Sequence, residues 1–307
     1  MPAPEVTVVV PTRNRRDVCR ETLRAVLGQR DVSLEVVVVD EGSTDGTCGM
    51  ITALDDDRVR VVRHDLPRGL PAARNVGTAA ATAPWVAWCD DDDLWAPDKL
   101  RAQLAALRAT GARWSVCGAV LVDPQLRVIG HQPAPDAATI AAALRRDNVV
   151  PGGGSGVVAE VALVRDAGGF DEALVSCEDW DLWLRLAARD APAVVDRPLV
   201  KYRIWPGSMS TKVDRMRTTR RQVLDRHGGS DAGEYEHERW LAKQLVRGGD
   251  RVPAAAAYAR LALRHRKPSE LVRAIGAVVA PMRLAAAGDE RARAAVPPSW
   301  LTEVATW

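Results

Sequence analysis

The sequence has few cysteines, a single phenylalanine and no long apolar run. Its five cysteines are Cys19, Cys48, Cys89, Cys117 and Cys177. Their number is odd, their spacing is wide, and no CxxC pair occurs. This pattern disfavours a disulfide framework and a structural zinc site, and it is typical of a reducing compartment.

The sequence also lacks the features of membrane-spanning and secreted proteins. No uninterrupted apolar run approaches the ~20 residues that a membrane helix needs. The opening residues, MPAPEVTVVVP, lack the basic and then apolar segments of a secretory signal. The formal net charge is only +2, which does not favour a nucleic-acid partner. We therefore expect a cytoplasmic protein that binds no nucleic acid.

The first third of the chain alternates short apolar runs with helical patterns. Val6–Val10, Val36–Val39, Val59–Val62 and Trp85–Trp88 are typical of buried strands. Helical spacing between them, as in 15–28 and 72–81, predicts βαβ units and an α/β fold with a parallel sheet covered on both faces.

Helices and strands continue to alternate until about residue 211. The sequence predicts a helix over 97–109, strands at 119–122 and 157–158, and a helix near Trp180. Beyond residue 211 strand patterns disappear, and stretches rich in alanine and arginine take over. We expect an α-helical C-terminal extension over 212–307. Its apolar and basic residues allow packing on the main body, pairing with a second subunit, or contact with an anionic membrane.

Polar side chains follow three of the predicted strands. Pro11, Thr12 and Arg13 follow the first strand, Asp40 ends the second, and Asp90–Asp93 follow the fourth. Ligands of open α/β sheets bind beyond the carboxyl ends of the strands. We therefore expect these groups to meet at one rim.

The run Asp90–Asp93 is the strongest single feature. Adjacent carboxylates repel one another unless a cation compensates. Mg²⁺ and Mn²⁺ prefer carboxylate oxygens and often bridge to substrate phosphates. An acidic turn that caps the next helix is the alternative, but it accounts for one or two aspartates rather than four. The sequence therefore favours a metal site.

A second acidic pair, Glu178 and Asp179, opens the helix near Trp180. The helix dipole favours an ionised carboxylate there, and an ionised carboxylate can act as a general base. Capping alone is the alternative. Tryptophans beside the acidic clusters either wall a sugar site or pack in the core.

Other motifs give weaker signals. The glycine loop 151–156 lacks the ending of a phosphate-binding loop, so we interpret it as mobile or closely approached backbone. The five histidines show no metal-binding spacing. We expect His227 and His237 to decorate helices.

Taken together, these motifs resemble a known family. The segments PTRNR, VVVVDEGSTDGT, LPAARNVGTAAATAPWVAWCDDDDLWAPDKL, GGFDE and CEDWDLWLRLA, in this order, are similar to family 2 glycosyltransferases of the GT-A fold. The resemblance covers 6–210. It implies a catalytic domain over 1–211, with a nucleotide-sugar half over about 1–95 and an acceptor half over about 96–211. It also implies a Rossmann-like, mostly parallel central sheet.

The resemblance implies transfer of a sugar from a nucleoside-diphosphate donor, a UDP or dTDP sugar, with Mn²⁺ or Mg²⁺ and inversion by single displacement. The acceptor would be a glycan, a lipid-linked group, a peptide or a natural product. Asp179 would be the catalytic base beside Glu178, and Asp92 the metal ligand. The donor-binding positions would be Pro11, Thr12, Arg13, Asp40, Arg74, Asp90, Asp91 and Arg203.

Two positions depart from the family pattern. Glu41 stands where a second aspartate is usual, and Trp205 stands where a histidine that approaches the metal is often found. The second departure weakens the expectation of a further protein ligand to the metal. Two alternatives stay open, a sugar nucleotidyltransferase and a non-catalytic sugar-binding relative. The first normally needs a glycine-rich basic loop after the first strand, which PTRNR does not provide.

Overall fold

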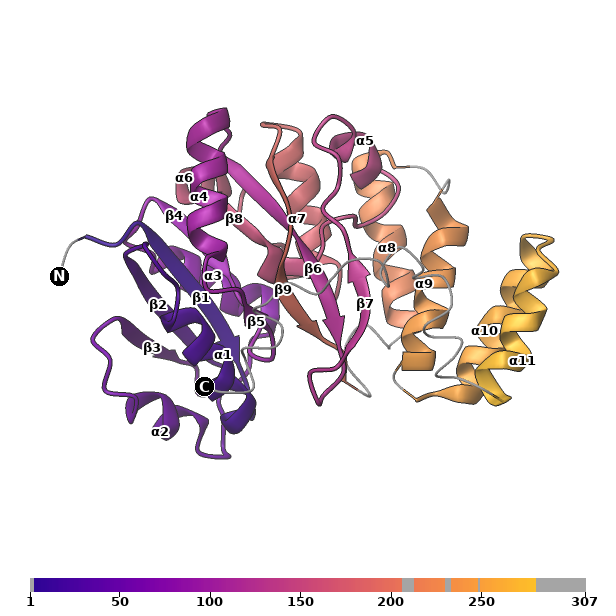
Figure 1. Ribbon diagram of the computed structural model, residues 1–307, viewed down its shortest axis with the longest axis horizontal. Helices are drawn as coiled ribbons and strands as arrows, with labels where there is room; N and C mark the ends of the chain where they lie inside the picture. The colour runs from indigo at the N-terminus through magenta and orange to yellow at the C-terminus, as the bar shows by residue number, and fades with distance from the viewer. Residues whose placement is uncertain (1–2, 206–212, 230–232, 248, 280–307) are drawn as a thin grey trace.

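A computed structural model describes residues 3–205, 213–229, 233–247 and 249–279 of the chain (Figure 1). In this part of the chain one nine-stranded sheet has the order β3-β2-β1-β4-β8-β6-β9-β5, and β7 pairs with β6. The strands are β1 (Val6–Thr12), β2 (Leu34–Asp40), β3 (Val59–Arg63), β4 (Trp85–Trp88), β5 (Leu94–Trp95), β6 (Trp114–Val122), β7 (Val128–Gln132), β8 (Val157–Glu160) and β9 (Ala193–Arg203).

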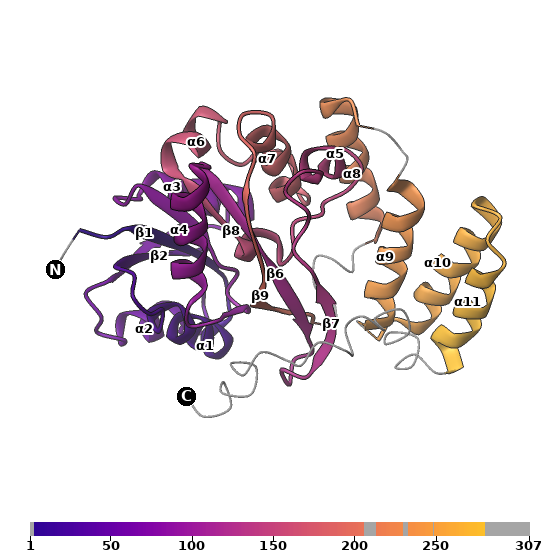
Figure 2. The same ribbon diagram turned by 45° about the horizontal axis from the view of Figure 1, so that its top comes forward.

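Helices cover both faces of the sheet (Figures 1 and 2). Those before the C-terminal region are α1 (Arg16–Leu27), α2 (Thr47–Thr52), α3 (Leu70–Ala79), α4 (Lys99–Thr110), α5 (Ile140–Leu144), α6 (Val161–Asp166) and α7 (Glu178–Ala187), with a 3₁₀ turn at Gly153–Gly156. Alternate strand residues point to opposite faces. Thus Val8 packs in one apolar cluster with α1 and α4, whereas Val9 packs in the other with α6 and α7.

The predicted α/β fold class is confirmed, and the sheet is mixed in direction. Parallel pairing joins β1 to β2 and β4, β2 to β3, and β6 to β9. The remaining pairs are antiparallel, with β8 between β4 and β6. The predicted strands near the N-terminus all form. The strands β1, β2 and β4 are short runs of β-branched or aromatic residues buried on both faces, whereas the edge strand β3 is only partly buried.

The strands β5, β7 and β9 were not predicted. The middle of β9 is Asp196-Arg197-Pro198, which hides its strand pattern, and its pairing with β6 shifts register beside Gly118. A proline and a register shift both interrupt the alternation by which strands are recognised. The missed strand matters because β9 ends at Arg203, a predicted donor-binding residue.

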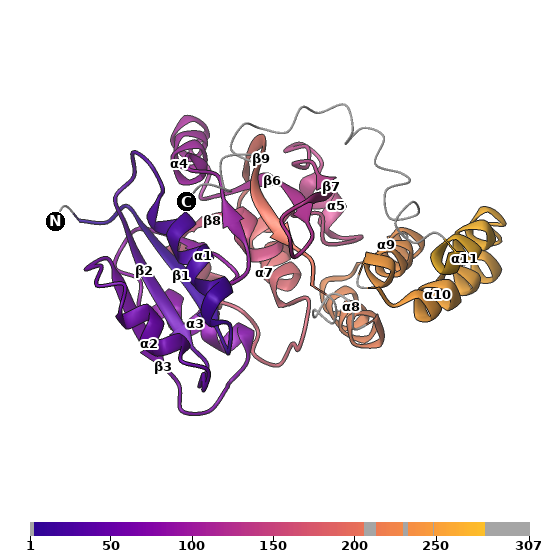
Figure 3. The same cartoon turned by 60° about the horizontal axis from the view of Figure 1, so that its bottom comes forward.

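Four helices follow the sheet, namely α8 (Val213–His227), α9 (Glu234–Arg247), α10 (Arg251–Arg264) and α11 (Ser269–Val279). The views in Figures 2 and 3 place them in a row at the end of the molecule beyond β7. Val223 and Leu224 of α8 belong to the same apolar cluster as Trp180, so α8 packs into the main body. A separate cluster around Tyr258 joins α9, α10 and α11. The predicted domain limits stay a prediction, and part of 212–307 lies outside the described residues.

An apolar surface runs along the outer helices. Leu263, Val272 and Ile275 are 78%, 71% and 67% exposed. Among the described residues, no helix is long and apolar enough to cross a membrane. The expected contact with a membrane or a second subunit is not tested by these observations and stays a prediction.

Candidate active site

The carboxyl ends of β1, β2 and β4 meet at one edge of the sheet, as the sequence predicted. Thr12 and Asp40 are direct neighbours in the register of β1 and β2. The Thr12 hydroxyl donates to Asp91 Oδ2 across 2.6 Å, which ties the end of β1 to the acidic run after β4. The predicted rim therefore exists.

The four consecutive aspartates have four different environments. Asp90 pairs with Arg74 at 2.6 Å, and Asp92 pairs with Arg15 at 2.7 Å. Asp91 accepts the Thr12 hydroxyl, and Asp93 is fully buried.

Asp93 has a structural role. It accepts the Ser155 hydroxyl at 2.5 Å and the Arg203 backbone N–H at 3.0 Å. Its carboxylate thus fastens the end of β9 and the glycine loop to the acidic run. Of the four aspartates, only Asp90, Asp91 and Asp92 could therefore contact a bound ligand.

Arg74 bridges the two acidic clusters. Its guanidinium, 2% exposed, donates to Glu178 Oε1 at 2.8 Å and to Asp90 Oδ1 at 2.6 Å. It also lies over the ring of Phe170, 5.3 Å from the centroid. A Cβ on Gly154 would lie 3.0 Å from a guanidinium nitrogen, so the glycine loop is backbone that Arg74 approaches closely. Arg74 thus joins the acidic run after β4 to the acidic pair at the start of α7, and the three side chains of Arg74, Asp90 and Glu178 form one charged cluster.

Burial is the main cause of the raised pKa values of the carboxyl groups in and around this cluster. Burial raises the pKa of Glu178 to about 7; Arg74 opposes the rise and Asp179 adds to it. Burial and the neighbouring Asp92 raise the pKa of Asp91 to about 7. The pKa of Asp92 is raised by burial and by Asp90, against the opposing Arg15. A further cation would favour the ionised carboxylates.

Asp179, the second residue of α7, lines a pocket of about 390 Å³ together with Arg74 and Asp90. The Trp180 N–H donates to its Oδ1 at 2.7 Å, and the Asn148 amide donates to its Oδ2 at 3.2 Å. Burial raises the pKa of Asp179, while Arg74 opposes that rise. The predicted base and two predicted donor residues therefore face one cavity.

The same pocket has walls that the sequence analysis missed. Met216 of α8 and Glu236, His237 and Trp240 of α9 line it. His237 does not merely decorate its helix, because it is 5% exposed and pairs with Asp147. No motif signalled these residues, since they occur singly in helical segments.

The tryptophans beside the acidic motifs are core residues. Trp88, Trp95, Trp180 and Trp183 are at most 2% exposed, and Trp180 also lines the pocket. Core packing is therefore the main role of this set.

Asp40 lies at the rim but is fully buried. Its Oδ1 accepts the Ser43 N–H at 3.0 Å and its Oδ2 pairs with Arg63. Glu41 bonds His64 and accepts the backbone N–H groups of Arg68 and Gly69, each at 2.6 Å. The longer Glu41 side chain thus braces the start of α3, and a nucleobase contact by Asp40 stays a prediction.

The remaining predicted donor residues lie around the rim. Pro11 is buried and Arg13 is exposed. The Arg203 side chain, 3% exposed, pairs with Glu21 at 2.8 Å. The Trp205 ring lies 5.6 Å from the Arg203 guanidinium and 5.8 Å from that of Arg15. Trp205 therefore contacts the arginine that neutralises Asp92; the rest of this segment, 206–210, lies outside the described residues.

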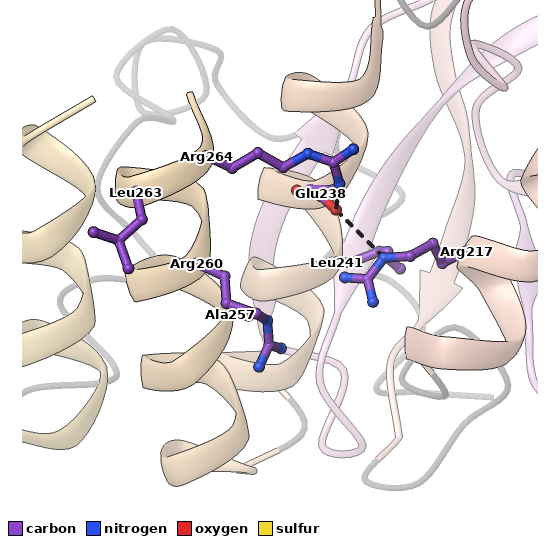
Figure 4. Close-up of a pocket in the computed structure, with 7 residues that line it drawn as sticks. All are labelled: Arg217, Glu238, Leu241, Ala257, Arg260, Leu263 and Arg264. Atoms are coloured by element: carbon purple, nitrogen blue, oxygen red, sulfur yellow. Dashed lines mark hydrogen bonds and ion pairs between the residues drawn. The ribbon is translucent and has the colours of Figure 1, made fainter. Parts of the chain in front are cut away.

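A second cavity, of about 500 Å³, lies among α8, α9 and α10 (Figure 4). Arg217, Arg260 and Arg264 line it, and Arg217 pairs with Glu238 at 3.3 Å. It shares no lining residue with the acidic pocket, so it is a separate feature of the helical region.

The family model for glycosyl transferase family 2 matches residues 7–164, about half of the chain. The chain belongs to glycosyl transferase family 2. The match contains Thr12, Arg74 and the acidic run, and it ends before Asp179.

Among relatives of this family 2 chain, succinoglycan biosynthesis protein ExoO of Rhizobium meliloti (strain 1021) is 41% identical over 113 residues, which are 37% of this chain and 32% of that protein. UDP-Glc:alpha-D-GlcNAc-diphosphoundecaprenol beta-1,3-glucosyltransferase WfaP of Escherichia coli is 23% identical over 209 residues, 67% of this chain and 79% of that protein. The match thus spans about a third of the length of ExoO.

Solved structures show the same GT-A fold. S. aureus TarS 1-349 in complex with UDP-GlcNAc superposes with a TM-score of 0.59 at 19% identity, covering 91% of this chain and 82% of that one. Mannosyltransferase PcManGT from Pyrobaculum calidifontis, in complex with GDP-Man and Mn²⁺, gives 0.51 at 21% identity, covering 99% and 79%. At these identities the likeness concerns the fold alone.

The chemistry of the acidic run suits a metal only in part. Carboxylate oxygens are suitable ligands for Mg²⁺ or Mn²⁺. Yet no three acidic, histidine or cysteine side chains converge as a metal site in the described part of this family 2 chain. Asp90, Asp91 and Asp92 are each engaged by a different partner. The residues therefore fit an ion that takes most of its ligands from a substrate.

The raised pKa of Glu178 predicts a pH effect on the stability of this family 2 chain. Between its ordinary pKa near 4.5 and its folded pKa of about 7, the folded state binds more protons than the unfolded state. The free energy of unfolding therefore falls as pH rises through this window. In Glu178→Gln, the free energy of unfolding should fall by about 1–3 kcal/mol less than in the wild type between pH 5 and pH 8. Urea denaturation at both pH values measures this difference. Exposed Glu172→Gln is the control, and an unchanged slope in Glu178→Gln would contradict the prediction.

Proposed function

We propose that this chain transfers a sugar from a UDP or dTDP sugar to a hydroxyl group of an acceptor. The observation that supports this most is the single pocket that joins Arg74 and Asp90 to Asp179. A cationic group beside a carboxylate base is what a displacement with an anionic leaving group requires. Family membership and the UDP-glucose named for WfaP support this donor class.

In this proposal the acceptor oxygen attacks the anomeric carbon from the face opposite the leaving diphosphate. Asp179 takes the acceptor proton, and no covalent intermediate is needed. Glu178 holds the Arg74 guanidinium, which stabilises negative charge that develops on the donor side. The residues proposed to bind the donor are Pro11, Thr12, Arg13, Asp40, Arg74, Asp90, Asp91 and Arg203.

We further propose that Asp92 holds Mn²⁺ or Mg²⁺ together with the donor phosphates. When bound, the ion supplies charge neutralisation for the departing nucleoside diphosphate. Arg15 now donates to Asp92 Oδ2, so it would share that carboxylate or release it. The Mn²⁺ named for PcManGT supports the choice of ion.

For the acceptor we propose a glycan, in free or lipid-linked form. The support is the printed name of WfaP, which describes a diphosphoundecaprenol-linked GlcNAc. Membership of family 2 argues against a sugar nucleotidyltransferase. Release of pyrophosphate from a nucleoside triphosphate would reverse this preference.

A thermal-shift screen tests donor and metal together. UDP, dTDP and their glucose conjugates, each with and without Mn²⁺, should raise the Tm of the wild type. Saturation at 100 times Kd contributes about 2.7 kcal/mol, or roughly 5 °C for a chain of this size. Asp92→Asn should lose most of the shift that depends on Mn²⁺, whereas Asp98→Asn, at a half-buried aspartate that pairs with Arg197 and does not line the acidic pocket, should keep it. Absence of any nucleotide-dependent shift in the wild type would contradict the proposal.

A further inference from the structure

One wall of the pocket that holds Asp179 comes from helix α9. His237 and Trp240 line this wall, and both lie outside residues 7–164, which the family model matches. The donor-side residues Arg74 and Asp90 line the same cavity. A molecule placed between these walls would touch the base and helix α9 together.

The hydrogen bonding of His237 leaves one ring nitrogen available. Its Nδ1 lies 3.0 Å from Asp147 Oδ1, and an ionised carboxylate only accepts, so Nδ1 bears the hydrogen. The other ring nitrogen, Nε2, is buried and has no hydrogen-bond partner among the described residues. Because buried polar atoms are normally satisfied, this nitrogen indicates a ligand with a hydrogen-bonding group such as a hydroxyl.

Trp240 adds an apolar surface beside that nitrogen. Its ring stacks on His237 with centroids 6.0 Å apart and planes at 26°. The side chain is partly buried and lines the pocket. Aromatic walls with a few placed polar groups are typical of small-molecule sites. A sugar ring, which has apolar C–H faces and hydroxyl edges, matches this combination.

Hydrogen bonds connect this wall to the proposed base. Asp147 Oδ1, which His237 contacts, also accepts the Asn148 backbone N–H at 3.0 Å. The Asn148 side chain then donates to Asp179 Oδ2 at 3.2 Å. The path from His237 to Asp179 therefore passes through two adjacent residues, so the position of one group constrains that of the other.

From these contacts we infer that His237 and Trp240 form the acceptor-sugar subsite. Trp240 packs on a face of the acceptor sugar, and His237 Nε2 forms a hydrogen bond with one of its hydroxyl groups. The inference rests on the proposed function, since it assigns the acceptor of that reaction. It also gives α9 a role in acceptor selection, separate from donor binding.

The test compares Trp240→Ala, Trp240→Phe and His237→Gln in the full chain, with His265→Gln as control. His265 belongs to the same helical region, contacts Tyr235 edge-on and pairs with a glutamate, but does not line the pocket. UDP release from UDP-glucose is followed against octyl glucoside, octyl galactoside and octyl N-acetylglucosaminide, and UDP affinity is measured by calorimetry.

Trp240→Ala and His237→Gln should raise the acceptor KM about tenfold, with UDP affinity close to that of the wild type. Trp240→Phe should restore most of the acceptor affinity. An unchanged acceptor KM in both Trp240→Ala and His237→Gln overturns the inference, as does a wild type that hydrolyses UDP-glucose but is stimulated by no glycoside. A wild type that neither binds UDP nor hydrolyses UDP-glucose overturns the proposed function itself, and the inference with it.

Discussion

Asp179→Asn is expected to lower kcat for sugar transfer by about 10³-fold, within the range that a positioned general base supplies. Asparagine has nearly the same shape and can still accept the Trp180 N–H that now bonds Asp179 Oδ1. Its amide cannot take the acceptor proton. The fold and the affinity for UDP should therefore persist while transfer is lost, which steady-state kinetics and calorimetry with UDP would measure side by side.

A matched control is Asp171→Asn. Asp171 pairs with Arg226 at 2.5 Å and does not line the pocket, so its variant should transfer sugar at nearly the wild-type rate. Transfer by Asp179→Asn at the wild-type rate would exclude Asp179 as the base. His237, which lines the same pocket, would then be the first residue to test in that role.

The first half of the fold could be predicted because its signals are local. Each strand from β1 to β4 is a short apolar run, and each polar motif follows the end of its strand. Parallel pairing then places Thr12, Asp40 and Asp90 at one edge. No long-range information was needed for this rim.

The different roles of the four aspartates could not be predicted from local sequence patterns. Asp93 turns inward because its partners, Ser155 and Arg203, arrive from 62 and 110 residues away. Adjacent identical residues look alike in sequence, and only the path of β9 and the glycine loop separates them. The same holds for Trp240, whose helical spacing predicts a buried face but not the body that it packs against.

The compensation of the acidic run also differs from the sequence-based expectation. The sequence-based expectation was that a metal ion alone compensates the charge of the four aspartates. In the structure, Arg15 neutralises Asp92 and Arg74 neutralises Asp90. Part of the positive charge is thus built into the chain, so a bound ion would add to an arrangement that already holds together.

Arg74→Met is expected to destabilise the protein by about 3–5 kcal/mol, the cost of breaking a buried ion pair from one side. The substitution keeps an apolar side chain in place but leaves Glu178, which is 5% exposed, without its cation. Asp90 loses the same partner. Urea denaturation at pH 7.5 would measure the free energy of unfolding. Arg60→Met, which removes an arginine that is 44% exposed from its pair with Glu35, should cost about 1 kcal/mol or less.

Two further measurements separate lost charge from lost packing in Arg74→Met. Adding Glu178→Gln removes the unpaired carboxylate, so the double variant should recover part of the stability. Lowering the pH to 5 protonates Glu178, whose pKa of about 7 would rise further without Arg74, so the deficit should shrink there. A deficit that is the same at both pH values, and in both Glu178 backgrounds, would mean that Arg74 acts through its packing on Phe170 rather than through its charge.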